Sequence, residues 1–139
     1  MARVFWDTNL FIYLMEATGQ HVRVRKMREA MLHRGDELLT SALTLGELLV
    51  KPKSERADDL AKSYERLLTS AATVLPFDAA SARRFADIRA TKAVKAPDAI
   101  QLACAANAEV DLFITNDDRL SRLVVPGIQF ISSLERAFL

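Results

Sequence analysis

Five short apolar runs alternate along this chain with longer stretches in which apolar residues recur every three or four positions. The short runs have the length of buried strands, whereas the longer period is that of a helix with one apolar side. Parallel strands need a crossover between them, and this crossover is right-handed. The alternation therefore predicts an α/β fold of three layers, in which helices cover both faces of a central, mostly parallel sheet of four to five strands.

The element boundaries follow from the same pattern. The predicted strands are residues 3–6, 37–42, 73–77, 111–115 and 128–131. The predicted helices are residues 10–15, 21–33, 55–72, 78–90 and 98–107. A further helix is predicted after the second strand, and Glu47 lies one turn into it. The stretch 55–72 has the clearest helical spacing, and we expect its apolar positions, Leu60 and Leu67 among them, to share one side. Gly35 suits a left-handed cap after the helix at 21–33.

Length and composition favour one packed domain over residues 1–139. Half of the residues are hydrophobic and 27% are charged, as in ordinary globular proteins, and no repeat or flexible linker marks an internal boundary. Lys and Arg number 19 against 18 Asp and Glu, so the overall charge gives no support for a polyanionic partner. Residues 21–34 are locally basic, which is typical of a solvated helix face.

Single residues exclude other classes of protein. Cys104 is the one cysteine in the sequence, so no intramolecular disulfide forms, and its small apolar neighbours predict a buried thiol. His21 and His33 lie in the basic stretch without partners at zinc spacing, which argues against a zinc site. Because no signal peptide or apolar run long enough for a membrane span is present, we expect a cytoplasmic protein without a membrane anchor.

Acidic residues follow the predicted strands. Asp7 comes directly after the first strand, Asp117 comes two residues after the fourth, Glu47 lies one turn into the helix after the second, and Asp98 opens a helix. Ligands of open parallel sheets bind outside the carboxyl ends of the strands, so these four carboxylates can meet there. Taken singly, each also has a structural explanation as a helix cap or as a favourable first-turn charge.

Convergence of the four acids without a compensating Lys or Arg predicts a metal ion, because the carboxylates would otherwise repel one another. Oxygen-only ligands favour Mg²⁺ or Mn²⁺, which activate water and neutralise charge in phosphoryl chemistry. Neighbouring polar residues can orient the carboxylates or donate hydrogen bonds to a phosphate, although they can equally close turns. These neighbours are Thr8, Asn9, Thr115 and Asn116.

Four segments resemble, in order, the four motifs of PIN-domain ribonucleases. The segments are FWDTNLFIYL, SALTLGELL, KAPDAIQLACA and LFITNDDRL. Within that family, the length and arrangement are most similar to the stand-alone toxins of the VapC type. The resemblance implies that Asp7, Glu47 and Asp98 are the central metal-binding, catalytic carboxylates and that Asp117 is the fourth. The adjacent Asp118 is the alternative for this fourth position.

The resemblance also implies an activity and partners. It implies a metal-dependent endoribonuclease that hydrolyses RNA phosphodiester bonds, forms a homodimer and pairs with an antitoxin protein. The basic residues Arg23, Arg25, Lys26 and Arg28 are then candidates for contacts with the RNA backbone or the antitoxin.

Two other functions stay open at this point. One is a PIN-like module that binds RNA or protein without cutting. The other is a magnesium phosphohydrolase of small phosphorylated metabolites, although the chain lacks both a DxD pair after the first strand and a Gly-rich phosphate loop.

Overall fold

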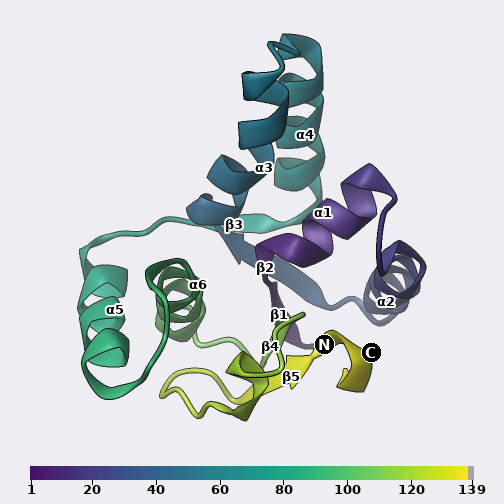
Figure 1. The fold of residues 1–139 in the computed structure, drawn as a ribbon. Helices are drawn as coiled ribbons and strands as arrows, with labels where there is room; N and C mark the ends of the chain where they lie inside the picture. The colour runs from purple at the N-terminus through teal and green to yellow at the C-terminus, as the bar shows by residue number, and fades with distance from the viewer. Residues whose placement is uncertain (138–139) are drawn as a thin grey trace.

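A five-stranded parallel sheet runs through the centre of residues 1–137, the part of the chain that the computed structural model describes (Figure 1). The strands are β1 (Arg3–Trp6), β2 (Glu37–Ser41), β3 (Thr73–Leu75), β4 (Leu112–Thr115) and β5 (Phe130–Ser133). Their order across the sheet is β3-β2-β1-β4-β5, and every neighbouring pair is parallel. The predicted sheet is thus confirmed, with five strands.

Six α-helices connect the strands within this described part of the chain. They are α1 (Thr8–Glu16), α2 (His21–Arg34), α3 (Ala42–Ser54), α4 (Asp58–Ala71), α5 (Ala79–Thr91) and α6 (Ala96–Asn107). Two 3₁₀ turns, η1 (Leu120–Arg122) and η2 (Leu134–Arg136), follow β4 and β5. No helix within residues 1–137 is both long and apolar enough to cross a membrane.

Side chains of the strands alternate between two buried faces. Phe5 and Phe113 stack with ring centroids 5.0 Å apart in the core under α5 and α6. Val4, Trp6 and Ile114 point to the opposite face, where the apolar sides of α1 and α2 cover them. Both faces of the central strands are therefore apolar, as a parallel sheet between two helical layers requires.

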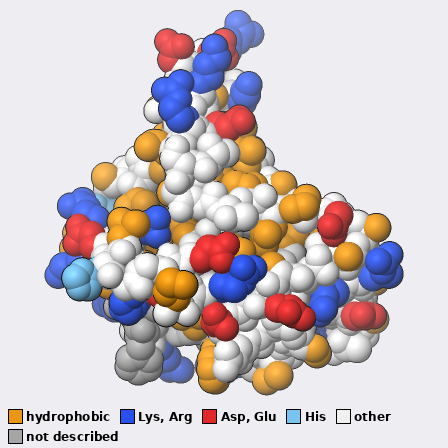
Figure 2. Space-filling model, turned by 180° about the vertical axis from the view of Figure 1, so that it is seen from behind, with side chains coloured by type: hydrophobic (Ala, Val, Ile, Leu, Met, Phe, Trp, Pro, Cys, Tyr) orange, Lys and Arg blue, Asp and Glu red, His pale blue; other side chains and the backbone are white. Residues whose placement is uncertain are grey.

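Helices α3 and α4 form an antiparallel pair that projects from the body of the molecule (Figure 1). Charged side chains of both signs gather at its free end (Figure 2). The helix predicted over 55–72 is wrong at its start, because α3 ends at Ser54 and α4 begins only at Asp58.

The break between the two helices is a left-handed cap at Arg56. Its φ is 54°, its N–H donates to the Lys53 carbonyl, and the Ala57 N–H donates to the Pro52 carbonyl. These are the two bonds of a Schellman motif, in which glycine is usual. Within α4, Leu60 and Leu67 stay 40% and 53% exposed. The projecting pair has too few neighbours to cover them.

The last strand lies two residues later than predicted. Gly127 has a φ of +99°, and the Ile128 N–H donates to the Val125 carbonyl, so Ile128 belongs to a turn.

Two other expectations, for Gly35 and Cys104, are confirmed. Gly35, with φ +74°, ends α2 in the left-handed region, and Cys104 is buried in the core, where burial raises the pKa of its thiol to about 11.

We expect Gly127→Ala to destabilise the fold by roughly 1–3 kcal/mol, because an alanine there is strained at positive φ. A Cβ at this position would also lie 2.5 Å from the Ala106 carbonyl oxygen. Urea unfolding would measure the change. Gly46→Ala is the matched control, since Gly46 lies inside α3 with open space around it and should gain up to about 1 kcal/mol. Equal effects at the two glycines would contradict this account.

Candidate active site

Asp7, Glu47, Asp98 and Asp117 line one cavity of about 410 Å³. Asp7 directly follows β1, Asp117 follows β4, Glu47 lies in α3, and Asp98 lies in the first turn of α6. The chain passes from β1 to β2 on one side and later returns to β4 on the other side of β1. The order therefore reverses beside β1, and the acids gather at the switch point where open α/β sheets bind ligands.

Hydrogen bonds from the start of α1 and from the end of β4 fix the Asp7 carboxylate. Its Oδ1 accepts from the Thr8 N–H at 2.7 Å, which caps α1, and its Oδ2 accepts from the Thr115 hydroxyl at 2.9 Å. Burial raises the pKa of Asp7, these two hydrogen bonds oppose the rise, and the charges of Asp98 and Glu47 add to it. The capping role and the place in the cavity are thus both present in one residue.

Glu47 is anchored by the buried hydroxyl of Thr8, which donates to its Oε1 at 2.6 Å. The amide of Gln101 donates to the Thr8 hydroxyl at 2.9 Å and to the Thr44 hydroxyl at 2.8 Å, and its carbonyl oxygen accepts from the Ser41 hydroxyl. Gln101 is 2% exposed. Because the polar groups of this buried network are hydrogen-bonded to one another, they hold the Glu47 side chain in a fixed position at the cavity.

Asp98 projects from the first turn of α6, after Pro97. Burial raises the pKa of its carboxyl, and the charge of Asp117 raises it further, whereas Arg119 and Lys95 lower it and Glu47 adds to the rise. The Asp98 carboxylate is therefore repelled by Asp117 and Glu47 and attracted by Arg119 and Lys95. The first-turn position is also favourable for a negative charge, as the sequence suggested.

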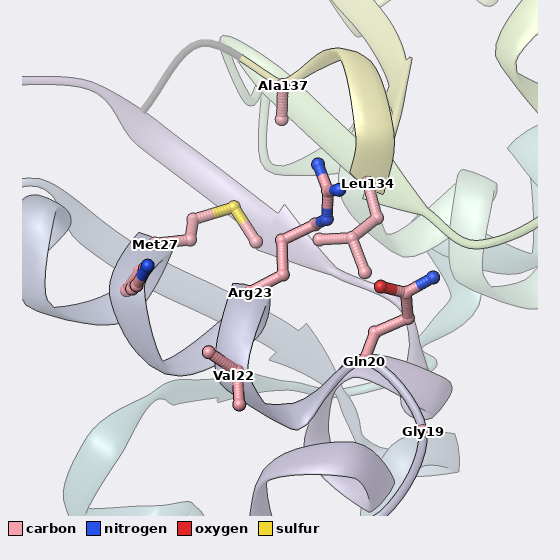
Figure 3. A pocket seen from close by; sticks show the side chains of 8 residues that line it. Gly19, Gln20, Val22, Arg23, Met27, Leu134 and Ala137 are labelled. Carbon is pink, nitrogen blue, oxygen red and sulfur yellow. The ribbon is translucent and has the colours of Figure 1, made fainter.

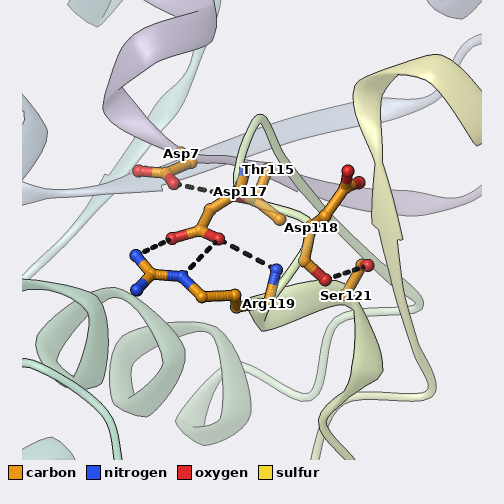
Figure 4. Close-up of polar contacts among 6 residues, drawn as sticks. All are labelled: Asp7, Thr115, Asp117, Asp118, Arg119 and Ser121. Carbon is orange, nitrogen blue, oxygen red and sulfur yellow. Dashed lines mark hydrogen bonds and ion pairs between the residues drawn. The ribbon is translucent and has the colours of Figure 1, made fainter.

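Asp117 is in a different state, because Arg119 occupies its carboxylate (Figure 4). Arg119 donates from Nε to Oδ1 at 3.2 Å and from a terminal nitrogen to Oδ2 at 3.1 Å, while its N–H donates to Oδ1 at 2.9 Å. Hydrogen bonding to Arg119 lowers the pKa of Asp117. The expectation of four acids without a compensating cation is therefore wrong at this member of the cluster.

The remaining sequence candidates divide into two groups. Thr8 and Asn9 line the cavity, and Thr115 contacts both Asp7 and the Asp117 N–H. Asn116 does not line the cavity, because its amide donates to the Tyr13 hydroxyl at 2.7 Å.

Asp118 is exposed and lies outside the cavity lining, with its carboxylate turned away from Asp7 (Figure 4). Between the two adjacent acids, it is Asp117 whose side chain faces the cavity.

The donors of this site fit a hard divalent cation by their chemistry, since all four are carboxylates. As the side chains stand in residues 1–137, however, no group of three or more Asp, Glu, His or Cys residues is arranged to hold one ion. Glu47 is bonded to Thr8, and Asp117 to Arg119. The carboxylates therefore share a cavity but must shift before several of them can bind the same ion.

Two residues that shape this site, Gln101 and Arg119, were not predicted from the sequence. Gln101 is a polar residue within the apolar run IQLACAANA, and a lone polar side chain on the buried side of a helix was the signal that could have revealed it. Arg119 follows Asp117 by two residues, but spacing alone does not reveal an ion pair across a turn.

A second cavity, of about 540 Å³, lies beside the first half of α2. Arg23 lines it together with apolar Met27 and Leu134 (Figure 3). Lys26, also of the basic segment, is a further lining residue. No carboxylate is among its lining residues within the described chain. It contains no acid of the first cavity, so the two are distinct sites.

Comparison with known families supports the resemblance found in the sequence. The profile of the PIN domain matches residues 4–125. No curated protein sequence gives a significant match.

Solved structures are similar over nearly the whole chain. VapBC2 from Rickettsia felis, bound to a DNA fragment from its promoter, has a TM-score of 0.74 at 14% identity and covers 94% of this chain and 97% of its own. A toxin–antitoxin complex from Klebsiella pneumoniae has a TM-score of 0.66 at 23% identity, with 90% and 94% covered. FitAcB from Neisseria gonorrhoeae has a TM-score of 0.60 at 25% identity, with 82% and 87% covered.

The raised pKa of Asp7 predicts how stability depends on pH. A carboxyl whose folded-state pKa lies above its unfolded value stabilises the fold fully only below the unfolded pKa, and this stability is lost as the pH rises through the folded pKa. Asp7→Asn keeps a good cap and carries no charge. In EDTA at pH 7 we expect it to melt at or above the wild-type temperature, with the difference shrinking as the pH falls towards about 4.

Asp7→Ala is the control for the capping role, because it lacks the charge as Asp7→Asn does but also lacks the cap. It should therefore be less stable than Asp7→Asn by about 1 kcal/mol at every pH. Thermal melts of the three proteins from pH 7 to pH 4 would measure both effects. If Asp7→Asn melts well below wild type at pH 7, the claim that burial of the ionised Asp7 carboxylate destabilises the fold is wrong.

Proposed function

The chain belongs to the PIN-domain family, and on that premise we propose that it is a divalent-metal-dependent endoribonuclease, the toxin component of a toxin–antitoxin pair. The observation that carries the proposal is the cavity into which Asp7, Glu47, Asp98 and Asp117 converge from four separate elements. A chain selected for stability alone has no reason to bring four carboxylates to one cavity, since each raises the cost of ionising the others.

A bound Mg²⁺ or Mn²⁺ supplies this site with an activated water and with positive charge against the attacked phosphate. The chain's own residues supply orientation. Thr115 and Thr8 fix Asp7, and Thr8 also fixes Glu47, so that the two carboxylates enter the cavity at defined angles. Gln101 fixes Thr8 from below. Such support for metal ligands typically changes metal affinity or activity by about 10–100-fold when it is removed.

RNA as substrate and an antitoxin as partner complete the proposal. Both are expected of a VapC-type toxin. The similar structure from Rickettsia felis is VapBC2, and the one from Klebsiella pneumoniae is a toxin–antitoxin complex. We also propose that the protein forms a homodimer, as the resemblance to VapC-type toxins implies. A water nucleophile leaves a 5′-phosphate and a 3′-hydroxyl, whereas attack by the ribose 2′-hydroxyl would leave a cyclic phosphate.

The four acids allow a direct test of the nuclease. Asp7→Asn, Glu47→Gln, Asp98→Asn and Asp117→Asn keep shape but remove the charge that a cation needs, so each should slow cleavage on the order of 100-fold or more. The measurement is cleavage of single-stranded RNA with Mg²⁺ or Mn²⁺, with the product ends identified. EDTA should abolish the wild-type activity.

Asp118→Asn is the matched control, because it removes a neighbouring charge that lies outside the cavity. It should cut at the wild-type rate. Cleavage that survives EDTA, cyclic phosphate ends, or a loss on Asp118→Asn without a loss on Asp117→Asn would each count against the proposed chemistry. Tight RNA binding with no cleavage under any metal would favour the non-catalytic binding module.

Arg23 and Lys26 are the part of the basic segment that we propose for contact with the RNA backbone, because both line the 540 Å³ cavity. The double variant Arg23→Gln and Lys26→Gln should weaken RNA binding and lower the slope of log affinity against log salt by about 1.4, which is two phosphate contacts on a single strand. Binding of labelled RNA in EDTA at several salt concentrations measures the slope.

Arg25 offers the control, since it is exposed on the same helix and does not line that cavity. Arg25→Gln should leave the slope unchanged. If the double variant and the control have the same slope as wild type, the segment is only a solvated helix face.

A further inference from the structure

Asp117 is the one acid of the cavity that is in an ion pair, within the residues that the structure describes. Arg119 contacts both of its carboxylate oxygens. Asp7 and Glu47 accept hydrogen bonds from neutral donors, and Asp98 lies near Asp117 and Glu47 on one hand and near Arg119 and Lys95 on the other. The positive charge is therefore placed on one side of an otherwise acidic cavity.

This ion pair is open to solvent and can be displaced. The Arg119 side chain is 77% exposed and that of Asp117 is 30% exposed. Exposed pairs are weak, because water and salt screen both charges and the long side chain loses freedom when it is fixed. A divalent ion carries twice the charge of a guanidinium and is the stronger competitor for the same oxygens.

Arg119 also has space into which it can move. A smaller cavity of about 140 Å³ adjoins the acidic one, and Asp98 and Asp117 belong to the walls of both. Arg119 and Lys95 line this smaller cavity. A guanidinium released from Asp117 can thus remain beside the site without a change in the backbone.

We propose that Arg119 is a built-in counter-ion, which occupies Asp117 in the metal-free protein and must be displaced when a divalent cation binds. Arg119 thereby sets the metal affinity of the site. The inference rests on the proposed function, because it assumes that the four carboxylates bind a cation. It concerns the free protein and requires neither RNA nor cleavage.

The test is titration of the full-length protein with Mn²⁺, followed by calorimetry or by the electron paramagnetic resonance of the free ion. Arg119→Gln should bind Mn²⁺ up to about fivefold more tightly than wild type, the gain expected when a weak exposed pair no longer competes. Arg119→Lys keeps the charge but not the two-point contact, and it should bind close to wild type.

Two controls separate competition from a general change of charge. Arg122→Gln removes the same charge from an exposed position in the same turn, and its Mn²⁺ affinity should stay at the wild-type value. Asp117→Asn removes the carboxylate for which the two cations compete, so adding Arg119→Gln to it should produce no further gain.

The outcomes are distinct. If wild type binds no Mn²⁺, the proposed metal-dependent function fails and this inference fails with it. If wild type binds and Arg119→Gln binds equally well, or gains no more than Arg122→Gln, the inference alone is overturned, and Arg119 is only a stabiliser of the turn. A gain that persists in the Asp117→Asn background overturns it as well.

Discussion

The parallel pairing of β1 with β4 is the constraint on which the rest of the structure depends. β1 lies in the middle of the sheet between β2 and β4, and Val4, Phe5 and Trp6 are completely buried. Such a strand can be buried on both faces only if helices cover it from both sides, which fixes the three layers. The same pairing places Asp7 beside Thr115 at the carboxyl edge, so one element of packing determines both the core and the position of the acidic cavity.

Beneath that cavity, polar groups replace the apolar core. Thr8, Thr44 and Gln101 are almost inaccessible to water, and their side chains form hydrogen bonds with one another and with Thr40, Ser41 and Glu47. Leaving any one of them unpaired would cost about 1–3 kcal/mol. The network therefore holds the Glu47 carboxylate in one orientation relative to the sheet. Apolar side chains could not do this, because they donate no hydrogen bonds.

Much of this arrangement could be predicted from the sequence, for identifiable reasons. The strands and most helices follow from periodicity, and Asp7 and Asp117 follow from the rule that strand ends meet at one edge of a parallel sheet. Glu47 and Asp98 lie in helices, and the sequence indicated them by their positions near the predicted helix starts and by the resemblance to the family's motifs. Features that depend on a local conformation or on tertiary neighbours could not be predicted. Arg56 takes a left-handed conformation where no glycine signals it, and Leu60 stays 40% exposed although it is apolar.

The contact between Thr115 and Asp7 joins residues that are 108 positions apart in the chain. At the usual speed of protein synthesis of about 5–20 residues per second, roughly 5–20 seconds separate the appearance of the two residues. During that time β1 has no partner on one side, and the acidic cavity lacks one wall. A chain that stops before β4 cannot complete the site, so the order of synthesis itself delays the assembled cavity until Thr115 and Asp117 have been made.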